Sequence, residues 1–295
     1  MNSMDIESKK FLGQPKNFVS IFNALLFDGQ QVLKPEYLKD ENSELVMNVS
    51  SKHVDIIKRY EDGTYLDLFV IESQSYVDPS MVARVMEYES VARMRYIRQC
   101  FKKHVPMHTR LPMILTVVLY VGESKWNAAK RLSELEIIHP GFEDMFNEFK
   151  LNLIELNTNH KYNTGEKATQ DFFDLLRMIY RKQVLKEDLD REFNRDALYF
   201  AYVVTKNKEL LSIYNKSEKG DVKVCRALDE MFEESTNRGI QMGIKQGIEQ
   251  GIEQGIALNQ FEVYQTMLDK GFSVKTIASI FSVSEESIKT LLMRT

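Results

Sequence analysis

The sequence has little cysteine, no long apolar run and no excess of positive charge. Cys100 and Cys225 are its only cysteines, and two thiols so far apart in sequence make neither a disulfide framework nor a zinc signature. Disulfide-rich secreted domains are therefore excluded, and we expect a reducing compartment, the cytoplasm. The longest apolar run, at residues 111–122, is about half the length that a membrane helix needs, so we expect no membrane span.

The charge balance limits the kind of nucleic-acid contact that the chain can make. Its formal net charge of -4 at pH 7 excludes a globally basic protein that coats nucleic acid. Any contact with DNA must therefore come from a local basic patch.

Hydrophobic patterns predict the first elements of a folded domain. An apolar repeat at helical spacing stops near the Asp-Gly pair at 28–29, which is typical of a helix end. Residues 53–60 and 65–72 are rich in β-branched and aromatic side chains and flank an Asp-Gly pair at 62–63. Two such runs around Asp-Gly indicate a β-hairpin.

Two further buried strands complete this domain. They are predicted at 111–122 and 151–157, separated from the hairpin and from each other by helical patterns. Helix, hairpin, helix, strand, helix, strand predicts an α/β domain over residues 1–160, with a mixed sheet flanked by helices.

The rest of the chain divides into three parts with helical patterns. Residues 161–236 predict an α-helical extension, and residues 237–260 contain a Gly-Ile repeat with glycine at every fourth position. Each glycine inside a helix costs about 1 kcal/mol against alanine, but this spacing places the glycines on one stripe beside isoleucines, where two helices can approach closely. We expect a helical stalk that pairs two chains into a homodimer; the alternative is a flexible linker.

Residues 261–295 predict a small helical unit that resembles a helix-turn-helix. Serines cap two of its helices. Its charges are balanced, and Glu285 and Glu286 lie where the second helix would meet DNA phosphates. A docking or regulatory role is therefore favoured over sequence-specific DNA reading.

The predicted hairpin places two acidic residues, Asp55 and Glu72, close to each other. If residues 62–63 are a two-residue turn, Glu61 pairs with Thr64, and Asp55 then lies opposite Val70. Glu72 is one diagonal step from Asp55 on the same face, so the two carboxylates should converge.

Strand alternation decides which other side chains join them. Gln74 follows Glu72 on the same face, whereas Asp67 has the opposite parity and should face away. Oxygen-only ligands without histidine or cysteine suit Mg²⁺ or Mn²⁺. Such an ion can activate a water molecule and neutralise charge that builds up on a phosphodiester. Asp55 and Glu72 are therefore candidate metal ligands, with Gln74 as a third catalytic candidate.

A basic helix follows this site directly. Its candidate DNA-binding residues are Arg84, Arg95, Arg98 and Lys102. Arg95, Arg98 and Lys102 share one helical face, while an apolar face would pack on the sheet. Together with a metal site, this helix suggests a nuclease. The alternative is that the acid at the strand end only pairs with Arg84 or Lys58, and that the basic face is merely solvated.

The order of motifs in this chain resembles that of the recombination-promoting nuclease (Rpn) family, also called PD-(D/E)XK nuclease family transposases. The motifs are Asp55, then "IESQSYVDPSMVARVMEY", then "LPMILTVVLYVGESKW", followed by helices, a Gly-Ile repeat and a small helical unit. The resemblance covers nearly the whole chain. It implies a restriction-endonuclease-like core that cuts DNA with a divalent metal, in recombination or against foreign DNA.

The resemblance also implies roles for individual residues. Asp55 and Glu72 take the metal-ligand positions, and Gln74 takes the position where the wider superfamily usually has lysine. Glutamine can orient a water molecule or the substrate but supplies no positive charge. The acid that many of these nucleases carry on the first helix is absent, and Asn23 could supply a neutral oxygen there.

We therefore expect a Mg²⁺-dependent or Mn²⁺-dependent DNA endonuclease. Three alternatives stay open: a catalytically inactive nuclease fold that binds DNA or protein, a transcription regulator built around residues 261–295, and a transposase proper.

Overall fold

The computed structural model describes residues 3–41, 56–63, 66–104, 110–158, 160–217 and 220–293. The chain divides into two compact units, residues 1–229 and residues 230–295. Each unit is described by itself below.

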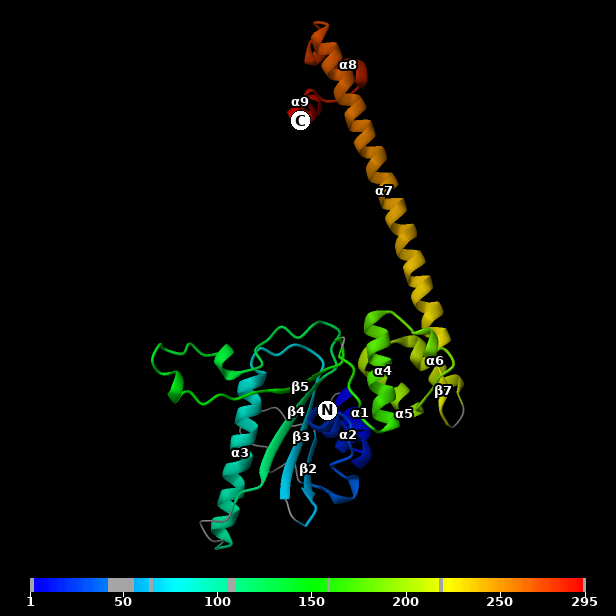
Figure 1. The fold of residues 1–295 in the computed structure, drawn as a ribbon. Helices are drawn as coiled ribbons and strands as arrows, with labels where there is room; N and C mark the ends of the chain where they lie inside the picture. The colour runs from blue at the N-terminus through cyan, green and yellow to red at the C-terminus, as the bar shows by residue number, and fades with distance from the viewer. Residues whose placement is uncertain are drawn as a thin grey trace. The chain divides into compact units, whose positions relative to one another are not determined.

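The first unit is built on a five-stranded mixed sheet (Figure 1). Its strands lie in sequence order, with antiparallel pairing of the first three and parallel pairing of the last three. The strands are β1 (Leu38–Asp40), β2 (Ile56–Glu61), β3 (Leu66–Gln74), β4 (Met113–Tyr120) and β5 (Asn152–Glu155). The predicted α/β fold with a mixed sheet and flanking helices is confirmed.

Helices cover both faces of this sheet (Figure 1). On one face, Tyr88 and Ala92 of α3 (Met81–Lys102) pack in one cluster with Leu68 and Val70 of β3. On the other face, Phe22 of α2 (Pro15–Phe27) contacts Phe69, with ring centroids 4.7 Å apart. Alternate residues of β3 therefore point to opposite helices, as strand geometry requires.

The hairpin register differs from the prediction. Glu61 pairs with Leu66, and Ile57 pairs with Val70, so four residues, 62–65, connect the strands and not two. In this register Ile57 and Val70 lie together in the cluster under α3. The shift is an even number of residues, so it leaves each side chain on its predicted face. Asp55 lies outside the described residues.

The connection between β4 and β5 also differs from the predicted helix. Residues 121–151 are irregular, with short 3₁₀ turns η3 (Leu132–Glu134) and η4 (Glu143–Met145). A Pro-Gly pair at 140–141, with Gly141 at a φ of +92°, breaks any helix in the middle of this segment.

Helices follow the sheet in the rest of the first unit. Three of them are α4 (Lys167–Arg181), α5 (Arg195–Thr205) and α6 (Lys208–Lys216), and α1 (Ser3–Leu12) joins them through stacked Phe11 and Phe200. Two short strands, β6 (Glu192–Phe193) and β7 (Val222–Lys223), pair beside them, and 3₁₀ turns occupy Pro35–Tyr37 and Lys186–Asp188.

Buried charges tie α4 to the segment that follows it. Asp171 and Asp174 are almost completely buried, and Arg191 donates to both, at 2.6 and 2.9 Å. Because each buried carboxylate has a cationic partner, this polar core satisfies its charges.

The Gly-Ile repeat lies inside a continuous helix, α7 (Cys225–Asp269). A Cβ atom added at any repeat glycine would meet nothing within 4 Å. The isoleucines beside them are 54–58% exposed. The repeat is therefore helical, and its glycine and isoleucine stripe is uncovered within the described part of the chain.

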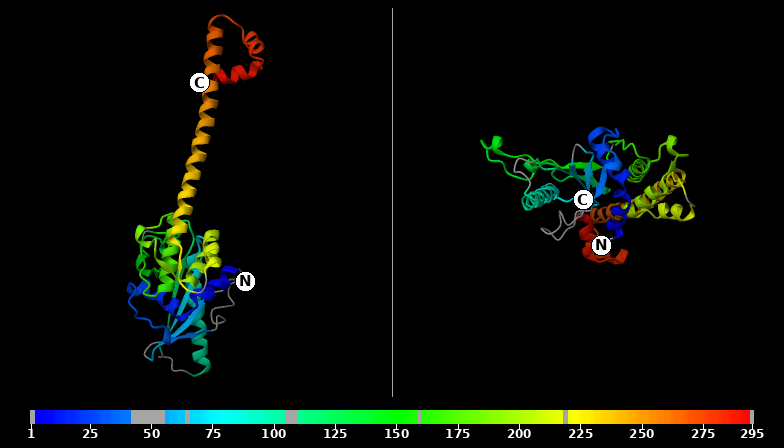
Figure 2. Two further views of the ribbon diagram at one scale, coloured as in Figure 1. Left: turned by 90° about the vertical axis from the view of Figure 1, so that its right-hand side faces the viewer. Right: turned by 90° about the horizontal axis from the view of Figure 1, so that it is seen from below.

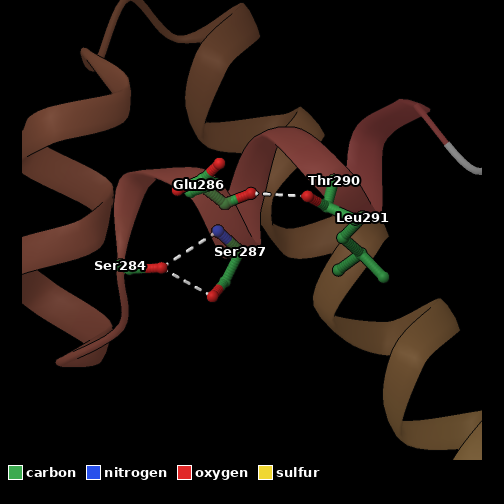
Figure 3. Close-up of a pocket in the computed structure, with 5 residues that line it drawn as sticks. All are labelled: Ser284, Glu286, Ser287, Thr290 and Leu291. Carbon is green, nitrogen blue, oxygen red and sulfur yellow. Dashed lines mark hydrogen bonds between the residues drawn. The ribbon is translucent and has the colours of Figure 1, made fainter.

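The C-terminal unit closes over a small apolar core. Tyr264 of α7 packs with Ile277 of α8 (Val274–Phe281) and Ile288 of α9 (Glu285–Met293). The Ser284 hydroxyl accepts from the Ser287 backbone N–H at 3.1 Å and so caps α9 (Figure 3). The hollow beside this cap contains Glu286, whose charge does not favour a phosphate.

No helix in the described ranges combines the length and the apolar character needed to cross a membrane.

Candidate active site

Glu72 and Gln74 lie at the carboxyl end of β3, where it runs parallel to β4. Their Cα partners on β4 are Val118 and Tyr120. Both residues are 4% exposed, and their side chains lie on the sheet face that α3 covers. The structure therefore brings these two predicted residues together, and Asp67 belongs to the opposite set of side chains, as expected from its parity.

Glu72 is held by an arginine from the first turns of α3. Arg84 Nη2 donates to Glu72 Oε1 at 2.9 Å, and Arg84 Nη1 donates to Asp78 Oδ2 at 2.6 Å. Arg84 also donates to the Tyr88 hydroxyl at 2.8 Å. The guanidinium thus joins two buried carboxylates and a phenol.

The local sequence explains this arrangement. Asp78 Oδ1 accepts from the backbone N–H and the hydroxyl of Ser80, at 2.8 and 2.6 Å, so Asp78 fixes the turn that starts α3. Arg84 and Tyr88 are four residues apart on that helix, which places them on one face.

The same contacts shift pKa values in the site. Burial tends to raise the pKa of Asp78, but its hydrogen bonds with Ser80 and Arg84 outweigh burial, so the pKa lies below its ordinary value. Burial tends to lower the pKa of Arg84, but Asp78, Tyr88 and the charge of Glu72 outweigh it and raise the pKa. Arg84 therefore stays a fixed cation beside the acids.

Gln74 has a side-chain hydrogen-bond donor without a partner among the described residues. Its backbone carbonyl accepts from the Val121 N–H at 2.8 Å. Its side-chain nitrogen is buried and has no hydrogen-bond partner among the described residues. A buried donor without a partner costs free energy, so this nitrogen is available as a donor to a bound water molecule or ligand.

The loop after β4 forms a fixed wall next to Gln74. The Tyr180 hydroxyl donates to the Val121 carbonyl, Asn157 Nδ2 donates to the Gly122 carbonyl at 3.0 Å, and the Tyr120 hydroxyl donates to the Ser124 carbonyl at 2.7 Å. Gly122 has no room for a side chain, because an added Cβ would lie 2.6 Å from the Ser75 carbonyl oxygen. The sequence did not predict that Asn157 and Tyr180 support this loop. Gly122 was the one residue of the loop whose type indicates close packing.

The predicted DNA-binding residues divide into two kinds. Arg98 and Lys102 are exposed and Arg95 is half-buried, in the last turns of α3. Arg84 is on the same helix but its side chain is only 14% exposed, because it pairs with Glu72 and Asp78. Of the two alternative partners for the acid, Arg84 is the one observed, whereas Lys58 pairs with Asp40 at 2.6 Å.

Asn23 holds the chain that follows α2. Its Nδ2 donates to the Leu33 carbonyl and its Oδ1 accepts from the Leu33 N–H, both at 2.9 Å. Both polar atoms of the amide already have backbone partners, so these contacts give Asn23 a structural role.

The acidic side chains at this strand end carry oxygen atoms, the ligand type that Mg²⁺ prefers, and both contact Arg84. Glu72 and Asp78 supply carboxylate oxygens around one guanidinium, the Gln74 amide carries one oxygen, and none of the three is a histidine or a cysteine. Within the described ranges no three histidine, cysteine or acidic residues form a metal-binding group. The other predicted ligand, Asp55, lies outside those ranges.

An α/β domain with a buried acid and an amide at the end of a central strand, followed by a basic helix, is consistent with a nuclease-like core. A family model with the description "Putative transposase, YhgA-like" matches residues 8–210, about two thirds of the chain. The chain belongs to this family, which is of the PD-(D/E)XK transposase type, and the family predicted from the sequence is thereby confirmed. No curated protein and no solved structure matches the chain.

Proposed function

We propose that this protein is a DNA endonuclease that depends on Mg²⁺ or Mn²⁺, hydrolyses phosphodiester bonds, and acts in recombination or against foreign DNA in the cytoplasm. The observation that carries the proposal is the buried pair of Glu72 and Gln74 at the carboxyl end of β3, beside the basic helix α3. Membership of a transposase family supports DNA as the partner, and two free cysteines are compatible with the cytoplasm.

Each candidate residue has a distinct part in this proposal. Glu72 would hold the metal together with Asp55, and the metal would supply Lewis acidity toward the phosphodiester and its attacking water. Gln74 orients that water through its buried amide, because it cannot act as a base. Arg84 positions the Glu72 carboxylate.

Phosphate binding is assigned to the exposed end of α3. Arg95, Arg98 and Lys102 lie on one face of the helix and can track a DNA backbone. Their contribution should be electrostatic and independent of sequence, because phosphate contacts position DNA without reading its bases.

A second candidate function is a nuclease fold without catalytic activity that binds DNA or protein. The ion pair between Arg84 and Glu72 favours it, because a fixed guanidinium competes with a metal ion for the same carboxylate. Gln74 also favours the inactive fold, because the nuclease superfamily that the sequence resembles usually has lysine at this position.

Incubation with supercoiled plasmid separates the two functions. The full chain should nick or linearise the plasmid with Mg²⁺ or Mn²⁺ and leave it intact with EDTA, and Glu72→Ala should be inactive under all conditions. Plasmid that is bound but uncut with every metal would support the inactive binding module.

We also propose that two copies pair through α7. Five exposed isoleucines lie beside five glycines in this helix. Covering the exposed part of each isoleucine yields about 1 kcal/mol, or about 10 kcal/mol for a pair of helices, which is comparable to the cost of association. A pair of active sites related by two-fold symmetry also matches the two strands of duplex DNA.

Substitution of the glycine stripe tests this pairing. Leucine at positions 243, 247 and 251 should block close approach and reduce the mass found by light scattering, because side chains would separate the helices. Leucine at Lys245, Glu249 and Glu253, each two residues from a repeat glycine, adds similar bulk on the opposite side of the helix from the glycines and is the control. An unchanged mass in the glycine variant would refute the pairing.

A further inference from the structure

An arm leaves the first unit between β4 and β5 (Figure 1). Its base is fixed: the Leu132 N–H donates to the Phe149 carbonyl and the Leu151 N–H donates to the Lys130 carbonyl, both at 2.9 Å. Leu132 and Leu151 also pack with Met81 in the core cluster at the start of α3. The arm is therefore anchored at its base, next to the first turns of α3.

The tip of this arm exposes large apolar side chains. Ile137 is 102% exposed, Met145 76%, Phe142 56% and Leu135 42%. Four such residues within eleven positions, on a segment anchored at both ends, form an apolar surface that nothing in the described part of the chain covers. Apolar surfaces of this kind mark interaction sites.

The charges around the tip restrict the partner. Residues 133–148 contain five acidic residues and neither lysine nor arginine, and all five acids are exposed. A surface that is apolar and negative repels DNA and anionic lipids. It fits a protein surface that is apolar and positive.

The far end of α3 is such a surface. Residues 90–103 contain five lysine or arginine residues and no acid. Met94 is 49% and Phe101 56% exposed, and with Arg98 they lie on one helical face at spacings of three and four residues. Charge and apolar character are thus complementary to those of the arm tip.

The arm of one chain does not meet this surface on the same chain. The base of the arm packs at Met81 and Val82, whereas Arg98 lies sixteen residues beyond Val82, about 24 Å along the helix. From that base the arm runs away from the axis of α3 (Figures 1 and 2). A second copy of the chain offers the same basic end without this restriction.

We propose that the arm tip, residues 134–145, docks on the basic end of α3, residues 94–103, of a second copy of this chain. Ile137 and Phe142 contact Met94 and Phe101, and the surrounding acids face Arg98 and Lys102. The docking does not require cleavage activity. It uses cations to which the proposed function assigns DNA, so arm and DNA exclude each other on this surface.

A photo-crosslinking residue at position 137 of the full chain tests the docking. Nitrogen-14 and nitrogen-15 chains are mixed without DNA, irradiated and analysed by mass spectrometry. Crosslinks should join light to heavy chains, with residues 94–103 as the acceptor. The same crosslinker at exposed Lys150, at the base of the arm, is the control and should not reach that peptide.

Charge reversal makes the test specific. Glu136→Lys with Asp144→Lys should lower the yield of this crosslink about tenfold, because two attractive pairs become repulsive. Adding Arg98→Glu and Lys102→Glu should restore it. Crosslinks confined to one chain, crosslinks that avoid α3, or a yield unaffected by reversal would overturn the proposal. None of these outcomes depends on whether the protein cuts DNA.

Discussion

Replacing Arg84 by methionine should destabilise the first unit strongly. The side chain of Arg84 is 14% exposed, and the Glu72 and Asp78 side chains that it joins are 5% and 10% exposed. Methionine keeps most of the packing of the arginine stem but removes the cation that both buried carboxylates contact. Removing one partner from a buried ion pair typically costs about 3–5 kcal/mol, a large share of the stability of a domain.

Arg93→Met is the matched control for this change. Arg93 also pairs with a buried glutamate on α3, Glu89, at 2.7 Å, but its own side chain is 41% exposed. Water therefore screens this pair, and we expect a loss of about 1 kcal/mol. Urea unfolding of both variants at pH 7 gives the two free energies of unfolding. Equal losses would refute a special role for the Arg84 network.

The pH dependence of the Arg84 variant has a definite sign. The pKa of Asp78 is lowered in the folded protein, in part by Arg84. Its contribution to stability is therefore present above the unfolded pKa, about 4, and lost as the pH falls through the folded pKa. The difference between wild type and Arg84→Met should be full at pH 7 and shrink below about pH 4.

Two further predictions concern the basic helix and the cysteines. Arg95→Glu with Arg98→Glu should weaken DNA binding and reduce its salt dependence, by about one unit of slope for each phosphate that the helix no longer binds; binding that does not change would mean that this face is only solvated. Burial raises the pKa of Cys225 to about 12. A thiol reagent at pH 8 should therefore label Cys100 alone in the folded protein and both cysteines in urea. Rapid labelling of both cysteines in the folded protein would contradict the burial of Cys225.

The sheet and the packing face of α3 could be predicted from the sequence because both follow simple periods. Alternation in β3 placed Glu72 and Gln74 under α3 and Asp67 on the other face, and this holds in the structure. The Asp-Gly pair at 62–63 correctly indicated a turn, but not its length. Both the predicted and the observed register bury Ile57 in the cluster under α3, so neither the hydrophobic pattern nor the turn residues fix the length of the connection.

The supporting contacts of the site could not be predicted in the same way. Asn157 donates to the carbonyl of Gly122, thirty-five positions away in the sequence. A single polar residue in a loop belongs to no repeating pattern, so the sequence does not indicate its partner. The arm between β4 and β5 forms only short 3₁₀ turns, although the spacing of its apolar residues predicts a helix. The sequence offered two partners for Glu72, Arg84 and Lys58. The strand register places Lys58 beside Asp40, with which it pairs, and Glu72 pairs with Arg84.

The most direct measurement of the central claim compares two buried glutamates in one cleavage assay. Glu72 and Glu89 are 4% and 5% exposed, and each is paired with an arginine of α3. With Mg²⁺ and supercoiled plasmid, Glu72→Gln should cut at least about a hundredfold more slowly than wild type, because a charged metal ligand is removed. Glu89→Gln should cut at nearly the wild-type rate. Equal rates for Glu72→Gln and wild type would contradict the assignment of the active site.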